Sequence, residues 1–331
     1  MSIQLLGSPV VRALACAILV AVCMAGCGGG ASNPTTPTMG GSLFALADGT
    51  RSGFGQPTGL AVSRDGKRLY FTARRLQDDA PAVYQLDLAT QAVTQLYAGA
   101  PLVEPGALAA TPDNRSLVIA DLAAVNGDTT GTVFRMPVTG AVAPESILAP
   151  GIVDLPGGVA LDDGGQRLFV TGYTAEGVPA VFQTDTNGVA PKVVAQGTPL
   201  TDPAALWVAN DQHALLVVDT AADLDGTASV FRVKIDGGAV ETLASAIPVT
   251  YPAGITTDNT GGELFVTGRT ATGAPAVLGV TLDKKVVRVV TTTASRSEPT
   301  GLVQSPVSPF VLYLTDAGGT DGAGNILTLF R

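Results

Sequence analysis

Residues 57–72 read PTGLAVSRDGKRLYFT, and this stretch decides the fold because variants of it return along the whole chain. Each copy has an opening proline, a short apolar run, a turn and a β-rich run. The copies begin at Pro57, Pro105, Pro156, Pro203, Pro252 and Pro299. A period of about 50 residues, filled with short strands and turns, predicts a β-propeller with one blade per copy.

The first copy shows how one blade is built from four strands. We expect Gly59–Ser63 to form the innermost strand and Lys67–Ala73 the second, with Asp65-Gly66 in the hairpin turn between them, because glycine supplies the positive φ of tight hairpins. Ala82–Leu88 and Ala92–Tyr97 then predict the third strand and the outer strand.

The two ends of the repeat predict how the ring closes. The last copy stops after its third strand, Asn325–Phe330, while an additional strand, Ser42–Ala47, precedes the first proline. Pairing these two segments completes the sixth blade and leaves no open ring edge. We therefore predict an all-β, six-bladed β-propeller of four-stranded antiparallel blades over residues 42–331.

The six copies are of two alternating kinds, which predicts approximate threefold symmetry. Blades one, three and five carry a proline before the third strand. Blades two, four and six instead carry an acid before the opening proline and an aspartate at the end of the second strand. These acids are Glu104, Asp202 and Glu298 in the first set and Asp121, Asp219 and Asp316 in the second.

Propeller topology places both sets of acids on one face, so we expect a rim of six carboxylates. Carboxylates that lie close together repel one another unless a cation separates them. Calcium prefers several oxygen ligands of this kind. The six acids are therefore candidate ligands of a structural Ca²⁺ ion, with turn capping by aspartate as the alternative.

The N-terminus indicates export and anchoring. Residues 1–26 hold one cation, Arg12, an apolar run and the sequence Met24-Ala25-Gly26 before Cys27. This resembles a bacterial lipoprotein signal, which implies lipidation of Cys27 and a location in the cell envelope, at the outer membrane if the source is Gram-negative. An ordinary signal peptide or an uncleaved anchor is the alternative. Residues 27–41, rich in Gly, Ser, Thr and Pro, predict a flexible tether.

Composition excludes several functions. All three cysteines lie within residues 1–27, and His213 is the only histidine, which rules out Ser–His and Cys–His catalysis and histidine-rich zinc sites in the propeller. The net charge of −9 disfavours nucleic acid as a partner. We expect a monomer that binds a protein or a glycan on one face.

The runs from Pro57 to Thr72 and from Pro299 to Asp316 resemble blades of the large group of six-bladed propellers that includes NHL-repeat proteins and gluconolactonases. In gluconolactonases the resemblance implies a divalent metal held by a Glu, an Asp and an Asn that follows an opening proline. The acids have counterparts here, but the asparagine does not. The positions after the prolines are Thr58, Gly106, Gly157, Ala204, Ala253 and Thr300.

Two functions of different classes therefore remain open. The first is a non-enzymatic, membrane-tethered binding scaffold. The second is a metal-dependent lactonase or esterase of the gluconolactonase type, in which a cation at the acidic rim polarises a carbonyl and a carboxylate acts as the base. The missing asparagine favours the binding scaffold.

Overall fold

The computed structural model describes residues 41–123, 131–140, 142–221, 227–238, 240–251, 253–270, 272–283, 285–292, 297–319 and 322–331. The predicted signal segment, the lipidation site at Cys27 and nearly all of the predicted tether lie outside these residues. None of the described helices is long and apolar enough to cross a membrane.

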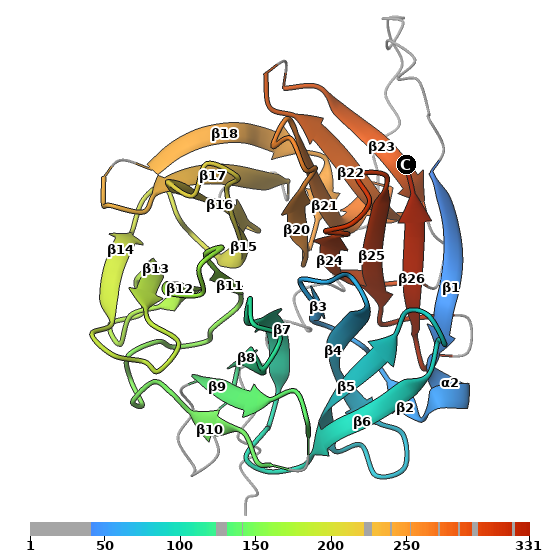
Figure 1. Cartoon of the computed structure of the whole chain (residues 1–331). Helices are drawn as coiled ribbons and strands as arrows, with labels where there is room; N and C mark the ends of the chain where they lie inside the picture. The colour runs from blue at the N-terminus through green and yellow to red at the C-terminus, as the bar shows by residue number, and fades with distance from the viewer. Residues whose placement is uncertain are drawn as a thin grey trace, which may run out of the picture. The chain divides into compact units, whose positions relative to one another are not determined.

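Six small antiparallel sheets stand around a central axis and form a six-bladed β-propeller (Figure 1). Blades one to three run from the innermost strand outward. Blade one comprises β3 (Leu60–Val62), β4 (Arg68–Arg75), β5 (Pro81–Asp87) and β6 (Val93–Ala98), with β2 (Phe54–Gly55) also paired to β4. Blade two comprises β7 (Pro105–Ala110), β8 (Ser116–Asp121), β9 (Thr132–Pro137) and β10 (Glu145–Ser146). Blade three comprises β11 (Val159–Leu161), β12 (Leu168–Tyr173), β13 (Pro179–Thr184) and β14 (Lys192–Gln196).

The remaining three blades complete the ring. Blade four comprises β15 (Pro203–Val208), β16 (Ala214–Asp219), β17 (Ala228–Lys234) and β18 (Val240–Ile247). Blade five comprises β20 (Ile255–Thr257), β21 (Glu263–Thr270), β22 (Pro275–Thr281) and β23 (Val287–Thr292), with β19 (Val249–Thr250) also paired to β21. Blade six comprises β24 (Pro299–Gln304), β25 (Val311–Asp316), β26 (Asn325–Phe330) and β1 (Ser42–Asp48).

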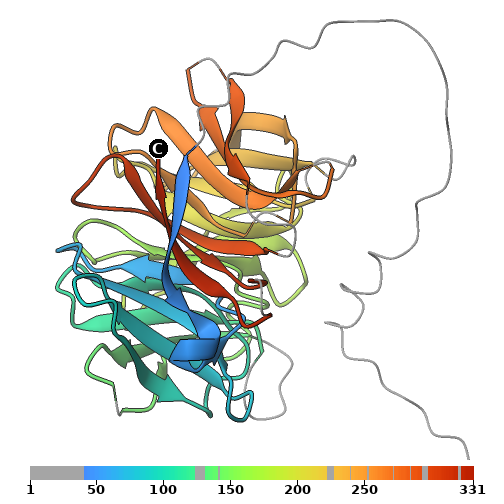
Figure 2. The ribbon, with the colours of Figure 1, turned by 90° about the vertical axis from the view of Figure 1, so that its right-hand side faces the viewer.

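The predicted ring closure is confirmed. Strand β1 pairs antiparallel with β26, from Ser42 opposite Phe330 to Asp48 opposite Asn325. Figure 2 shows the two strands side by side, blue against red. A single-turn helix, α2 (Gly49–Ser52), then leads into blade one. The innermost strand of blade six in turn contacts that of blade one, so every described innermost strand has a neighbour on each side.

The second strand of each blade is buried on both faces, and this places the hydrophobic core between blades. Strands β8 and β16 are buried along their whole length. Tyr70, Phe169 and Phe265 hold equivalent positions in blades one, three and five and are fully buried. Each blade therefore packs its second strand against both neighbours, and the ring is held by side-chain packing.

A threonine hydroxyl links neighbouring blades at four of the six junctions. Thr72 Oγ1 accepts a hydrogen bond from Gly59 N at 2.8 Å and donates one to Gly106 O of the next blade at 2.7 Å. Thr171, Thr267 and Thr315 donate to the next blade in the same way. Ala120 and Val218 hold this position in blades two and four, where no hydroxyl is available. The hydroxyl is therefore present in blades one, three, five and six, so the junctions follow the predicted alternation only in part, with blade six as the exception.

Two faces of the propeller follow from this topology. The entry face carries the residues that precede the innermost strands, among them Glu104 and Asp202. The hairpin face carries the turns between first and second strands, such as Arg64–Gly66. The pairs Pro105–Asp121, Pro203–Asp219 and Pro299–Asp316 confirm that both sets of acids belong to blade ends on the entry face.

Aspartates in surface turns predict the acid sensitivity of the fold. Hydrogen bonds from Ser63 and Thr111 lower the pKa values of Asp65 and Asp113, and the backbone N–H of His213 does so for Asp211. Among the acids that the structure describes, seven have a lowered pKa and one, Asp121, has a raised pKa. The lowered acids are Asp65, Asp78, Asp87, Asp113, Asp162, Asp185 and Asp211.

Since a lowered carboxyl pKa stabilises the folded state only while the group is ionised, this stability is complete above the unfolded pKa of about 4 and is lost as the pH falls below it. We expect Tm to be level from pH 7 to about pH 5 and to fall steeply below pH 4. Thermal unfolding followed by circular dichroism between pH 3 and 7 measures this. A Tm that rises on acidification contradicts it.

Candidate functional site

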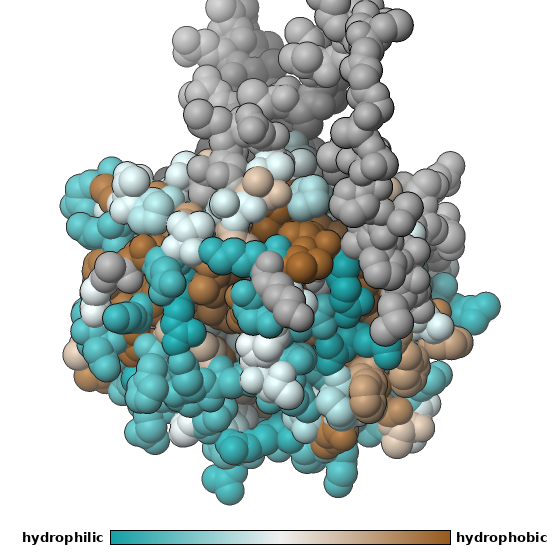
Figure 3. Space-filling model, turned by 90° about the horizontal axis from the view of Figure 1, so that it is seen from above, coloured by the Kyte–Doolittle hydropathy of each residue, from teal (hydrophilic) through white to brown (hydrophobic). Residues whose placement is uncertain are grey.

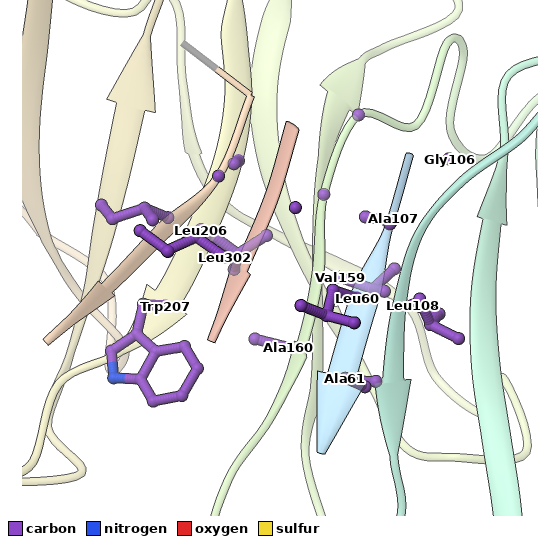
Figure 4. A pocket seen from close by; sticks show the side chains of 18 of the residues that line it. Leu60, Ala61, Gly106, Ala107, Leu108, Val159, Ala160, Leu206, Trp207 and Leu302 are labelled. Carbon is purple, nitrogen blue, oxygen red and sulfur yellow. The ribbon is translucent and has the colours of Figure 1, made fainter. Parts of the chain in front are cut away.

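A cavity of about 920 Å³ occupies the centre of the ring and is the main candidate site. Residues of all six innermost strands line it, and most of them are small or aliphatic (Figure 4). Leu60, Leu108, Val159, Leu206 and Leu302 bring their side chains toward it from five different blades. The walls are therefore apolar, while polar residues gather at the two ends of the cavity.

The entry end of the cavity carries an acidic group held in a fixed orientation. Asp202 and Glu104 line the cavity together with Tyr173. The Tyr173 hydroxyl donates to Asp202 Oδ1 at 2.7 Å, and the Thr220 hydroxyl donates to Asp202 Oδ2. Burial, with the hydrogen bond to Asp202, raises the pKa of Tyr173 far above that of an ordinary phenol. Tyr173 therefore stays protonated and acts as a permanent donor to Asp202.

The aspartates at the ends of the second strands close the entry loops. Asp219 is fully buried and accepts from Thr201 N at 2.8 Å, from Asp202 N at 3.1 Å and from Ala221 N at 3.1 Å. A carboxylate engaged by three backbone donors serves as a cap for its own loop. It also fixes the backbone of Asp202, whose side chain faces the cavity.

Blades two and six repeat this arrangement. Asp121 is buried and accepts from Val103 N, Glu104 N and Ala123 N. Asp316 accepts from the Ser297 hydroxyl and from the backbone N–H groups of Glu298, Gly318 and Gly319. Burial raises the pKa of Asp121, and the three backbone donors oppose that rise.

The structure thus places the six predicted acids in three backbone-linked pairs. Within the described residues, no group of three or more His, Cys, Asp or Glu side chains lies close enough to hold a metal ion. Asp121, Asp219 and Asp316 are buried and engaged by their own loops, which leaves Glu104, Asp202 and Glu298 as ligands. That set does not fit the six to eight oxygens of calcium. The calcium site stays a prediction, and the described residues contain no cluster of ligands for it.

The odd blades close their entry loops by a strained backbone. Gln56, Leu155 and Tyr251, each directly before the opening proline, have φ angles of 48°, 46° and 51°. This left-handed conformation is energetically unfavourable for L-residues other than glycine. Residues held in it are frequent at binding sites. Leu155 and Tyr251 are also exposed, by 47% and 68%. On the entry face, Leu155 and Tyr251 therefore hold two of the three positions between the acids, and Gln56 holds the third.

Trp207 lines the cavity on the side away from the entry face. The sequence predicted only that this residue packs between blades. It comes from β15 of blade four, yet it packs against the core of blades four and five and against the core of blades six and one. Its ring lies below Leu206 and Leu302 in Figure 4. Trp207 also lines a second cavity of about 420 Å³ toward the hairpin face, so the indole belongs to the walls of both cavities.

The outer wall offers no comparable feature on the side that Figure 3 shows. Hydrophobic residues there form separate patches among hydrophilic ones. Phe44 of β1 and Phe330 of β26 are exposed and make an edge-to-face contact, with 5.7 Å between their ring centroids. The central cavity therefore remains the best-defined candidate site.

Comparison with known proteins supports the fold and no more. No family model matches the sequence, and no curated protein matches it. Among solved structures, the chain is similar to a gluconolactonase from Xanthomonas campestris, with a TM-score of 0.63 and 16% identity over 88% of this chain and 89% of that one. It is also similar to a putative TolB from Agrobacterium tumefaciens, with a TM-score of 0.58 and 15% identity over 84% and 91% of the two chains.

A third similar structure is a chain of a nidogen–laminin complex, with a TM-score of 0.59 and 17% identity over 75% of this chain and 84% of that one. The three belong to proteins with different names and roles, and the resemblance predicted to six-bladed propellers is confirmed at the level of the fold. Because propellers carry many unrelated activities, function must be argued from the cavity.

Proposed function

We propose that this protein is an exported, lipid-anchored binding protein of the bacterial cell envelope that holds a ligand in the central cavity of its propeller. The observation that carries this proposal is the cavity of about 920 Å³, lined by all six innermost strands and bordered by the oriented carboxylate of Asp202. Concave, largely apolar sites with a few fixed polar groups are typical of ligand binding.

The geometry supports binding rather than hydrolysis. A metal-dependent lactonase needs acids that are free to hold a cation, whereas Asp121, Asp219 and Asp316 are engaged by backbone donors. A TolB among the similar structures agrees with an envelope location for propellers of this kind. The lactonase alternative is tested by assaying a panel of lactones and esters with added Ca²⁺, Mn²⁺ or Zn²⁺, and turnover above background would support it.

Ligand binding can be tested directly because Trp207 is the only tryptophan and lines the cavity. We expect a compound that enters the cavity to change the intrinsic fluorescence and to raise Tm in a saturable manner. A mixed panel of small organic cations, anions, sugars and neutral alcohols serves as the first screen. A flat response to the whole panel counts against the proposal.

The anchor is tested at Cys27. Replacing the acylated residue removes a lipid that supplies about 0.8 kcal/mol of membrane affinity per buried methylene. We expect Cys27→Ser to abolish incorporation of radiolabelled palmitate and to move the protein from the membrane fraction to the soluble fraction. Cys23→Ser, a cysteine four residues earlier in the same segment, is the matched control and should retain the label. Equal labelling of both variants would point to an ordinary signal peptide or an uncleaved anchor.

A further inference from the structure

The charges around the central cavity are all of one sign. The charged residues that line it are Glu104, Asp163 and Asp202, and no described Lys, Arg or His side chain lines it. Inside an apolar cavity a charge interacts more strongly than in water, because the effective dielectric constant is lower. The cavity therefore favours a cation and disfavours an anion.

Asp202 is prepared to receive a hydrogen-bond donor. Its two carboxylate oxygens have about four acceptor positions, of which the hydroxyls of Tyr173 and Thr220 occupy two. Its backbone is fixed by Asp219. The remaining acceptor positions of an oriented carboxylate suit an ammonium group, which carries three donors and no acceptor.

The rest of the cavity requires an apolar body on the same ligand. Beyond Asp202 the wall consists of aliphatic residues, including Leu60, Leu206 and Leu302, as far as the indole of Trp207. Methylene groups placed there are stabilised by burial, so the affinity of such a ligand should rise with its chain length. A metal ion that entered this part of the cavity would lose water ligands, and the aliphatic walls offer few oxygen atoms to replace them.

We infer that the ligand class of this cavity is an organic cation with an apolar chain, with its ammonium group at Asp202 on the entry face, where Glu104 adds a second negative charge, and its chain directed toward Trp207. This inference rests on the proposed function and adds the chemistry of the ligand. A free alkylamine and the side chain of a lysine on a partner protein share this chemistry.

The experiment measures binding of straight-chain alkylammonium ions of four to ten carbons to the full propeller, by calorimetry and by Trp207 fluorescence. Alkanols and alkylcarboxylates of the same lengths are the matched probes. We expect the ammonium ions to bind at least tenfold tighter than the alkanols, and the affinity to rise with chain length. Asp202→Asn and Glu104→Gln should each reduce the ammonium affinity by about tenfold, which corresponds to about 1.4 kcal/mol.

Asp236→Asn is the control, because it changes the net charge equally at an exposed turn and should leave the affinity unchanged. A lysine-containing tripeptide amide that competes with hexylammonium, with the same dependence on Asp202, supports the inference with a partner protein as the source. Alkanols or alkylcarboxylates that bind as tightly as the ammonium ions overturn the ligand class, while cavity binding still stands. If none of the probes binds, the proposal that the cavity holds a ligand is overturned.

Discussion

Replacing Asp219 with alanine is expected to destabilise the propeller by about 3 to 5 kcal/mol, because it leaves three backbone N–H groups without their acceptor and each buried unsatisfied group costs roughly 1–3 kcal/mol. Those groups belong to Thr201, Asp202 and Ala221. Asp219 itself has no exposed surface, so water cannot take its place without opening the entry loop.

Urea denaturation of the variant, followed by far-UV circular dichroism, measures this loss. Asp236→Ala, at an exposed turn, is the control and should stay within about 0.5 kcal/mol of the parent protein. A loss below about 1 kcal/mol for Asp219→Ala would show that the carboxylate is not a cap. Since Asp219 also fixes Asp202, the variant should bind cationic ligands more weakly even under conditions where it is fully folded.

The second large effect is expected at Gly59, where blade one meets blade two. A Cβ atom on Gly59 would lie 2.2 Å from Gly106 O and 2.9 Å from the Ala107 Cα. Both atoms belong to the backbone of the next blade, so the clash can be relieved only by separating the blades. We expect Gly59→Ala to cost about 3 kcal/mol, as overpacking of a close backbone contact does.

Gly164→Ala is the matched control, because its Cβ would meet only the flexible side chain of Gln166 at 3.6 Å. The free energy of unfolding of both variants is measured by urea titration. Junctions two–three and four–five already carry Ala107 and Ala205 at the equivalent position, which shows that only some junctions are this close. Equal stabilities of the two variants would contradict the proposed contact.

Much of the fold could be predicted from the sequence because the propeller is a repeat. The opening prolines, a turn after the innermost strand and the hydrophobic second strands each return about every 50 residues. The strand Ser42–Ala47 had no other partner than the last blade. The predicted second strand, Lys67–Ala73, differs from β4 (Arg68–Arg75) only at its ends. Strand ends depend on the loops, which vary from blade to blade.

The site was harder to predict, because the direction of a side chain depends on the loop that carries it. The sequence indicated where Asp121, Asp219 and Asp316 lie along the strands, yet their bonds to backbone N–H groups follow from the loop conformation. The contact of Tyr173 with Asp202 joins two blades and leaves no pattern in the repeat. One signal in the sequence could have identified the close junctions. Blade one combines Thr72 in its second strand with Gly59 directly before β3, whereas blade two has Ala120 and Ala107 at these positions.

The closing strand also determines how the propeller would respond to mechanical load. Ser42 is the first residue of β1 and is paired with Phe330, next to the C-terminal Arg331. A pull on the chain that precedes Ser42 therefore acts first on the hydrogen bond from Gly41 N to Val290 O and then on the end of the β1–β26 ladder, where hydrogen bonds can open one pair at a time. The pairing of β1 with β26 closes the ring. Tension from the N-terminal side would therefore begin to open the ring at this pairing.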